Sequence, residues 1–159
     1  MGEDHIKVVA RNRKARHDYN IEEEYEAGIV LQGTEVKAIR QNKISLKNSF
    51  ALIKDGEVWL HSMHIGKYDH GNRHNHEPER KRKLLFRKKQ IRSLIGKVEQ
   101  QGYTLVPLEV YFKNQLVKVK LALGKGKKKH DKRRDMKKRA HQREMERALK
   151  DEKVGRVDY

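Results

Sequence analysis

The chain has 159 residues, of which 38% are charged and 35% hydrophobic, and its formal net charge is +17. Cysteine is absent, which excludes disulfides, thiol catalysis and cysteine-based zinc fingers. No apolar run approaches the roughly 18 residues of a membrane span. Residues 1–80 hold 13 basic and 13 acidic residues, whereas residues 81–159 hold 26 basic and 9 acidic residues. This one-sided positive charge indicates a polyanionic partner, above all a nucleic acid.

The first half of the chain predicts a strand, a short helix and a hairpin. Residues 19–31 alternate between apolar and polar side chains, with Glu23 as the exception on the apolar side, which is typical of a half-buried strand. A turn and a short helical face follow over residues 33–39. Residues 50–60 are expected to form a hairpin, because the pair Asp55-Gly56 favours a type I′ turn.

The second half predicts a loop, a helix and a longer hairpin. Residues 70–83 are polar and are expected to be a loop. Helical spacing then joins Ile91, Leu94, Ile95 and Val98. Gly102 is expected to end that helix. Period-two alternation over residues 103–123 predicts two strands around a turn, with Lys118 and Lys120 facing solvent. One face of the first strand is expected to hold Val106, Leu108, Val110 and Phe112.

This order of elements predicts a mainly β fold. The leading candidate is an OB-like antiparallel β-barrel with about three helices packed outside it, and an open α+β sandwich is the alternative. Only eight of the 36 residues from Gly124 onward are apolar, so a domain boundary is expected near Leu123. Residues 1–123 would form the RNA-binding barrel, and residues 124–159 a basic tail with a glycine hinge and a helix capped by Asp131.

Few motifs point to chemistry. The run from Gly124 to Lys127 lacks the spacing and the Ser or Thr of a phosphate-binding loop. His70, His74 and His76 have ligand-like spacing, but a polar loop is the favoured interpretation, and a metal-dependent ribonuclease is the competing one. We therefore expect no catalytic residues, no metal site and no cofactor.

Two charged segments each leave two interpretations open. The acidic strand around Glu26 is either a solvated outer face, or a place where a glutamate accepts hydrogen bonds from a base edge or fixes a neighbouring Lys or Arg. The basic tail is either a non-specific electrostatic arm, or a segment that is disordered when free and folds inside an RNA-lined channel.

Four separate blocks of sequence carry a resemblance to a known family. They are residues 12–19 (NRKARHDY), 27–37 (AGIVLQGTEVK), 82–85 (RKLL) and 126–133 (GKKKHDKR). In this order they closely resemble the small protein B family, the SsrA-binding proteins of bacterial trans-translation. The resemblance runs from about Asn12 into the tail. Beyond about Arg147 the sequence shows no pattern of the family, so no role is assigned there.

The resemblance implies an OB-like fold and an RNA-binding function without catalysis, in the cytoplasm. Such a protein binds the tRNA-like domain of transfer-messenger RNA (tmRNA, SsrA RNA) and delivers it to the vacant A site of stalled ribosomes. Its tail probes the empty mRNA channel at the decoding centre of the small subunit. No membrane is involved. The alternative is a general ribosome-associated RNA-binding or RNA-chaperone protein.

The resemblance also implies two sets of site residues. Those expected to contact tmRNA are Asn12, Tyr19, Glu26, Leu85, Arg87 and Lys118. Those expected to reach the decoding centre are Gly126, Lys127, Lys128, His130, Asp131, Lys132 and Arg133. The chain departs from the family's pattern at Arg87, where members often carry Asn or His, and at Gly124, where many carry Ala.

Overall fold

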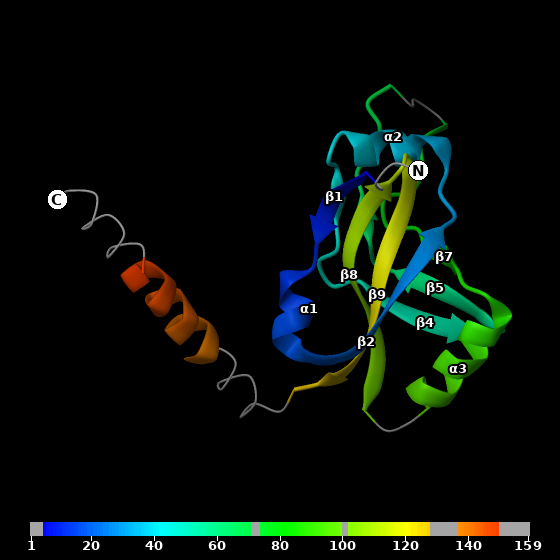
Figure 1. Cartoon of the computed structure of the whole chain (residues 1–159). Helices are drawn as coiled ribbons and strands as arrows, with labels where there is room; N and C mark the ends of the chain where they lie inside the picture. Colours follow the sequence, from blue (N-terminus) through cyan, green and yellow to red (C-terminus); the bar gives the residue numbers. More distant parts are fainter. Residues whose placement is uncertain (1–4, 71–73, 100–101, 128–136, 150–159) are drawn as a thin grey trace. The chain divides into compact units, whose positions relative to one another are not determined.

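The computed structural model describes residues 5–70, 74–99, 102–127 and 137–149. The chain divides into two compact units, Met1–Gly126 and Lys127–Tyr159. The first unit is mainly β, as predicted (Figure 1). In the second unit, residues 137–149 form a helix in which every side chain is exposed. That helix overlaps the one expected in the tail, whose predicted start at Asp131 lies outside the described residues.

Nine strands and three helices make up the described part of the first unit. In chain order they are β1 (Ile6–Arg11), α1 (Arg13–Asp18), β2 (Tyr19–Ile29), α2 (Gly33–Arg40), β3 (Ile44–Ser45), β4 (Phe50–Lys54), β5 (Glu57–His61), β6 (His64–Ile65), β7 (Arg82–Leu85), α3 (Lys88–Val98), β8 (Tyr103–Lys113) and β9 (Leu116–Gly126). Both predicted helices and both hairpins are confirmed, and the strand predicted at 19–31 is found over Tyr19–Ile29. Asp55 and Gly56 adopt the positive φ angles, 53° and 74°, that the predicted turn requires.

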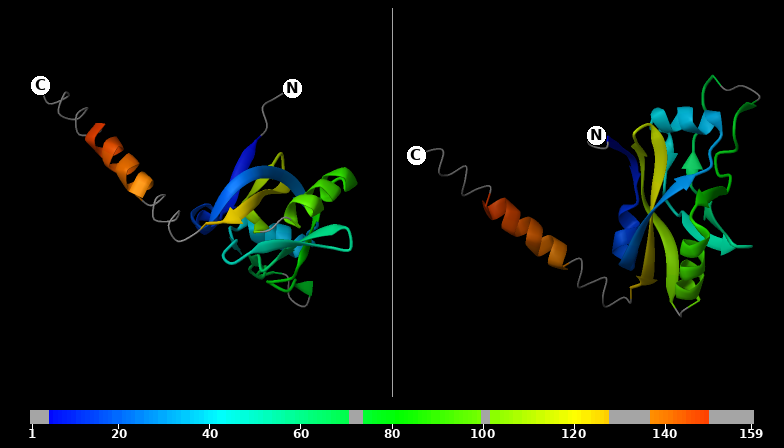
Figure 2. Two further views of the ribbon diagram at one scale, coloured as in Figure 1. Left: turned by 90° about the horizontal axis from the view of Figure 1, so that it is seen from below. Right: turned by 45° about the vertical axis from the view of Figure 1, so that its right-hand side comes forward.

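The strands of the main sheet are hydrogen-bonded in the order β1-β8-β4-β5-β7-β2-β9, and β9 pairs with β8 as well as with β2. All of these pairings are antiparallel. The short strands β3 and β6 form a separate pair. The long β8–β9 hairpin runs the length of the unit, with α2 near one end and α3 near the other (Figures 1 and 2).

Apolar side chains gather on both faces of the long strands. The larger cluster lies on the inner face and includes Ile39 of α2, Leu94 of α3 and Leu121 of β9. The smaller cluster lies on the outer face beneath α1. It consists of Ala15, Val106, Leu108 and Ala122, with Tyr19 and Ile21 packed against it. A strand that is buried on both faces cannot show clean alternation in its sequence.

Two β-bulges explain why the predicted faces are wrong in part. The register of β8 against β9 shifts between Pro107 and Glu109. One extra residue reverses which side chains point inward. Val106 and Leu108 therefore join the outer cluster, whereas Val110 and Phe112 join the inner one. A second shift between Ile21 and Glu23 divides β2 in the same way.

Four further expectations differ from the structure. The loop expected at 70–83 ends earlier, since Arg82 and Lys83 belong to β7. Helix α3 ends at Val98, before Gly102. The glycines expected to form a hinge lie in β9, because Gly124 is paired with Thr104 and Ile21 across the two neighbouring strands. β9 thus continues to Gly126, past the boundary expected near Leu123.

A buried ion cluster ties α2 to β7. Glu35 and Arg82 have no exposed surface and form an ion pair, and the Arg80 Nη2 donates to Glu35 Oε1 at 2.5 Å. Arg82 also donates to the carbonyl oxygens of Met63 and Pro78. Burial alone would raise the pKa of Glu35, but hydrogen bonds from Arg80, from the Gln32 backbone and from Arg82 hold it below its usual range.

Candidate nucleic-acid interface

One cross-strand row brings together residues that the sequence analysis singled out. Leu85 of β7 lies opposite Gly28 of β2, Gly28 lies opposite Lys118 of β9, and Lys118 lies opposite Tyr111 of β8. Directly paired residues share a face of the sheet. Glu26 lies two residues before Gly28 and therefore on the same face. Leu85, Lys118 and Glu26, three of the six predicted RNA contacts, thus lie on one outer face.

Glu26 is fixed by its neighbours on this face. Its carboxylate accepts a hydrogen bond from the Tyr111 hydroxyl at 2.5 Å and from the Lys113 ammonium at 3.3 Å. The Tyr111 hydrogen bond, followed by Lys113 and the positive charge of Lys118, lowers the pKa of Glu26 below its usual value. The arrangement corresponds to the interpretation in which this glutamate fixes a neighbouring cation.

Leu85 presents an apolar side chain at the edge of this face and is 51% exposed. Its position depends on Gly28, because a Cβ atom there would lie only 3.3 Å from Leu85 Cδ1. Glycine therefore permits the leucine to lie across the neighbouring strand. Arg87 follows two residues later as the exposed N-cap of α3, where its backbone N–H donates to Gln90 Oε1 at 3.0 Å.

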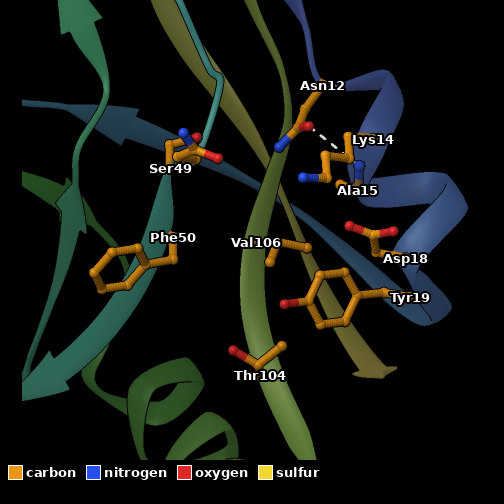
Figure 3. Close-up of a pocket in the computed structure, with 10 residues that line it drawn as sticks. Asn12, Lys14, Ala15, Asp18, Tyr19, Ser49, Phe50, Thr104 and Val106 are labelled. Carbon is orange, nitrogen blue, oxygen red and sulfur yellow. Dashed lines mark hydrogen bonds between the residues drawn. The ribbon is translucent and has the colours of Figure 1, made fainter. Parts of the chain in front are cut away.

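Asn12 and Tyr19 lie at the two ends of α1, away from the cross-strand row. They line a cavity of about 350 Å³ together with Lys14, Asp18 and Phe50 (Figure 3). The side-chain amide of Asn12 accepts from the Ala15 N–H at 3.1 Å and donates to the Pro107 carbonyl at 3.0 Å. Asn12 therefore caps α1 and ties it to β8, which identifies a structural role beside the predicted contact with RNA.

A second cavity beside α1 is strongly basic and was not predicted from the sequence. It has a volume of about 260 Å³, and no Asp or Glu is among the described residues that line it. Its cationic side chains are Arg11, Arg13, Lys14 and Lys47. Such a concave cluster of cations suits the phosphates of a nucleic acid. Arg11, Arg13 and Lys14 lie next to Asn12 in the sequence and could have been suspected for that reason. Lys47 is brought to them only by the fold.

The histidines of the 70–76 segment do not gather around a metal site in the described part of the chain. His76 is buried, with Nδ1 2.9 Å from Thr34 Oγ1 and Nε2 2.8 Å from the Ile65 carbonyl oxygen. His70 packs its ring against Tyr68. No group of three or more His, Asp or Glu side chains within the described ranges is placed to hold a metal ion.

The predicted tail contacts are only partly within the described residues. Gly126 is the last residue of β9 and pairs with Tyr19, and Lys127 follows it. The others, Lys128, His130, Asp131, Lys132 and Arg133, lie outside the described residues. The helix over residues 137–149 carries the cations Lys137, Lys138, Arg139, Arg143 and Arg147. Across the described ranges, no helix combines the length and apolar character needed to cross a membrane.

Comparison with known proteins agrees with these features. The family model described as SmpB protein matches residues 9–151. An SsrA-binding protein of Halothermothrix orenii is 59% identical over 151 residues, which cover 95% of this chain and 97% of that protein. An SsrA-binding protein of a Geobacillus species is 61% identical over 145 residues, covering 91% and 94% of the two chains.

A solved structure described as "tmRNA-SmpB: a journey to the center of the bacterial ribosome" is also similar. It shares 52% identity with this chain at a TM-score of 0.63, covering 75% of this chain and 84% of its own. The match to the family model spans most of the sequence, and the relatives are aligned over nearly their full lengths. The chain therefore belongs to the SmpB protein family.

Proposed function

We propose that this protein binds the tRNA-like domain of tmRNA and delivers it to the vacant A site of stalled ribosomes for trans-translation, in the cytoplasm. The observation that carries the proposal is the outer face on which Leu85, Lys118 and Glu26 are aligned across three neighbouring strands. The SsrA-binding relatives and the tmRNA-SmpB structure support this partner. The role is binding and delivery rather than catalysis.

The proposed RNA contacts divide into three chemical types. Lys118 and Arg87 supply positive charge for phosphates, Leu85 offers an apolar surface for a base or sugar, and Glu26 holds Lys113 in place or accepts from a base amino group. Asn12 and Tyr19 contribute from the cavity beside α1, next to the basic cavity. Phosphate contacts supply affinity, and the fixed geometry of the outer face supplies selectivity.

The pairing pattern supports an OB-like barrel as the finer description of the fold. Starting from β8, the pairings run through β4, β5, β7, β2 and β9 and return to β8. Each of these six strands then has a hydrogen-bonded neighbour on both sides, and β1, which pairs with β8, keeps one unpaired edge. The closed sheet would provide a rigid support for an RNA-binding surface.

The tail has a separate proposed role. Residues from Lys127 onward would enter the mRNA channel when no message fills it, with Lys128, His130, Asp131, Lys132 and Arg133 near the decoding centre. The segment would then lie as a helix along the ribosomal RNA, and residues 137–149 are already helical without it. Competition with mRNA for one volume would distinguish stalled ribosomes from translating ones.

Truncation of the chain tests whether the two roles are separable. A cut at Leu123 would remove the last residues of β9, so the informative truncation ends at Lys127. We expect the truncated protein to bind isolated tmRNA within about threefold of the full chain, because the outer face is intact. We expect it to lose peptide tagging on stalled ribosomes. Gel-shift titration and an in vitro tagging assay measure the two properties.

Two results would contradict the proposal. Loss of tmRNA binding and tagging together would defeat the separation of roles. Equal affinity for tmRNA and for bulk tRNA in competition would instead favour a general RNA-binding or RNA-chaperone protein. That second candidate is supported by the basic cavity, since cations that hold phosphates carry no sequence preference.

A further inference from the structure

The β4–β5 hairpin carries apolar side chains on its outer side that are partly exposed. Phe50 is 38% exposed and Leu52 is 51% exposed. Their cross-strand partners are His61 and Trp59, which are half-buried. Paired residues share a face, so these four side chains form one patch. We refer to the patch, with the neighbouring lysines Lys81 and Lys83, as the hairpin face.

The rings on the hairpin face are arranged for stacking. The Phe50 and His61 rings are parallel to within 4°, with centroids 5.2 Å apart. The Lys81 ammonium lies 5.2 Å from the centroid of the Trp59 ring. The Phe50 and His61 rings thus stack on one another, and a nucleobase would extend this stack on the outward face of either ring, as bases do on aromatic rings in proteins that bind single-stranded nucleic acids.

The charges on the hairpin face favour a polyanion. Lys83 lies opposite Trp59 and pairs with Glu57 at 2.7 Å, and Lys54 is on the same side at the end of β4. The hairpin face thus carries three lysines, Lys81, Lys83 and Lys54, and one carboxylate, Glu57. A second carboxylate, Asp55, lies in the adjoining turn. Lysines close to stacked rings can contact the phosphates that link stacked bases.

The hairpin face is continuous with the interface already described. Phe50 also lines the cavity that holds Asn12, Tyr19 and Lys14 (Figure 3). An RNA strand seated beside α1 would therefore reach Phe50 without leaving the surface. This continuity and the lysines favour RNA over a protein partner, because lysine is depleted in protein–protein interfaces.

We propose that the hairpin face binds unpaired RNA bases by stacking them on Phe50, His61 and Trp59. The proposal rests on the protein's function in binding RNA and extends it to a second type of contact. Base-paired RNA keeps its bases stacked on one another and offers no free ring to this surface. The hairpin face would therefore select loops, bulges or single-stranded segments.

Trp59 is the only tryptophan of the chain and reports directly on this surface. The full-length protein would be titrated with a short oligouridylate and, separately, with duplex RNA of equal charge, while tryptophan fluorescence is followed. We expect saturable quenching by the single strand and little quenching by the duplex. Measurements at low salt keep the weak binding of a short oligonucleotide within range.

Substitutions identify the rings that are responsible. Phe50→Ser and His61→Ser should each weaken oligouridylate binding roughly tenfold, in line with the loss of one stacked base. Leu116→Ser is the matched control, because Leu116 is 63% exposed at the β8–β9 turn and outside the hairpin face. If circular dichroism shows that the Phe50→Ser variant is unfolded, the Lys81→Gln variant is tested in its place. Lys81→Gln should weaken oligouridylate binding about threefold.

Several outcomes would overturn the proposal. They are no quenching by the single strand, equal quenching by single strand and duplex, and equal loss of affinity in the control variant. Unchanged oligouridylate affinity in all hairpin-face variants would point instead to a protein as the partner of this surface. A tmRNA gel shift on the same samples separates this proposal from the proposed function. Binding of tmRNA without quenching by oligouridylate would defeat only the stacking proposal.

Discussion

Glu26 shows how a carboxylate is kept on a surface that we propose binds a polyanion. Its negative charge is offset by the Lys113 ammonium and by the nearby Lys118, and the Tyr111 hydroxyl fixes its orientation. Burial, followed by the hydrogen bond to Glu26, raises the pKa of Tyr111, so the hydroxyl remains a donor. The glutamate is therefore part of a preorganised group of side chains and contributes geometry rather than repulsion.

The pH response of Glu26 follows from its lowered pKa. A folded-state pKa below the reference value of 4.5 means that ionised Glu26 stabilises the fold above that value. This contribution is lost as pH falls through the folded-state pKa. We expect Tyr111→Phe, which removes the strongest hydrogen bond, to raise the pKa of Glu26 towards 4.5. An NMR titration of the side-chain carboxyl carbon measures the shift.

The matched control for this titration is Tyr103→Phe, which removes the hydroxyl that donates to Glu22 at 2.8 Å. It should leave the pKa of Glu26 unchanged, because Tyr103 does not contact Glu26. Equal shifts in the two variants would show that the Tyr111 hydrogen bond does not set the pKa of Glu26.

At the scale of elements, β7 is the short strand on which the outer face depends. It pairs with β5 on one side and β2 on the other, and it carries Leu85. Its first residue, Arg82, is buried against Glu35 of α2. The ion pair therefore fixes both the position of α2 and the start of the strand that presents Leu85.

Breaking this buried pair should be strongly destabilising. Glu35→Gln would leave the Arg82 guanidinium buried without its counter-charge, at a cost of about 3–5 kcal/mol in the free energy of unfolding. Urea denaturation followed by circular dichroism measures this cost. The double variant Glu35→Leu/Arg82→Met should be closer to wild type, because the only charge that loses its partner is then Arg80, whose side chain is partly exposed. Glu79→Gln, at a side chain that is 67% exposed, is the control. A cost for Glu35→Gln no larger than that of the control would contradict this account.

The elements differ in how far the sequence predicts them. The hairpin at Asp55-Gly56 and helix α3 carry strong local signals, and both are found where the sequence predicts them, although α3 ends before Gly102. Strand β7 gives almost no local signal, since it has four residues and its Arg82 resembles a surface residue until Glu35 is placed beside it. The bulges in β2 and β8 are equally hidden, because both faces of these strands are apolar near α1.

At the scale of the whole molecule, positive charge is divided between two kinds of surface. The basic cavity lies in the first unit, and the helix over residues 137–149 adds five cations in the second. The sequence predicted the concentration of charge in the tail but not the basic cavity. Lys47 joins Arg11, Arg13 and Lys14 only through the folding of β1, α1 and β3 together.

The basic cavity makes a testable contribution to the salt dependence of tmRNA binding. If Arg11 and Arg13 each neutralise one phosphate, the variant Arg11→Ala/Arg13→Ala should make the negative slope of log K against log salt shallower. The reduction expected is about 0.7–0.9 for each lost contact. Filter-binding titrations over a range of potassium chloride concentrations give the slope. Lys67→Ala, an exposed lysine outside that cavity, should leave it unchanged. An unchanged slope in the double variant would exclude the cavity as a phosphate site.

The ladders on both sides of β9 have a mechanical consequence for the segment that follows it. Hydrogen bonds connect β9 to β2 as far as Gly126 and to β8 as far as Lys125. A pull on the C-terminal segment along the strand would load these two ladders in shear, so that many bonds must yield together rather than one after another. On the proposed function, a force on that segment during ribosome movement would therefore act on the first unit as a whole before it could separate β9 from its neighbours.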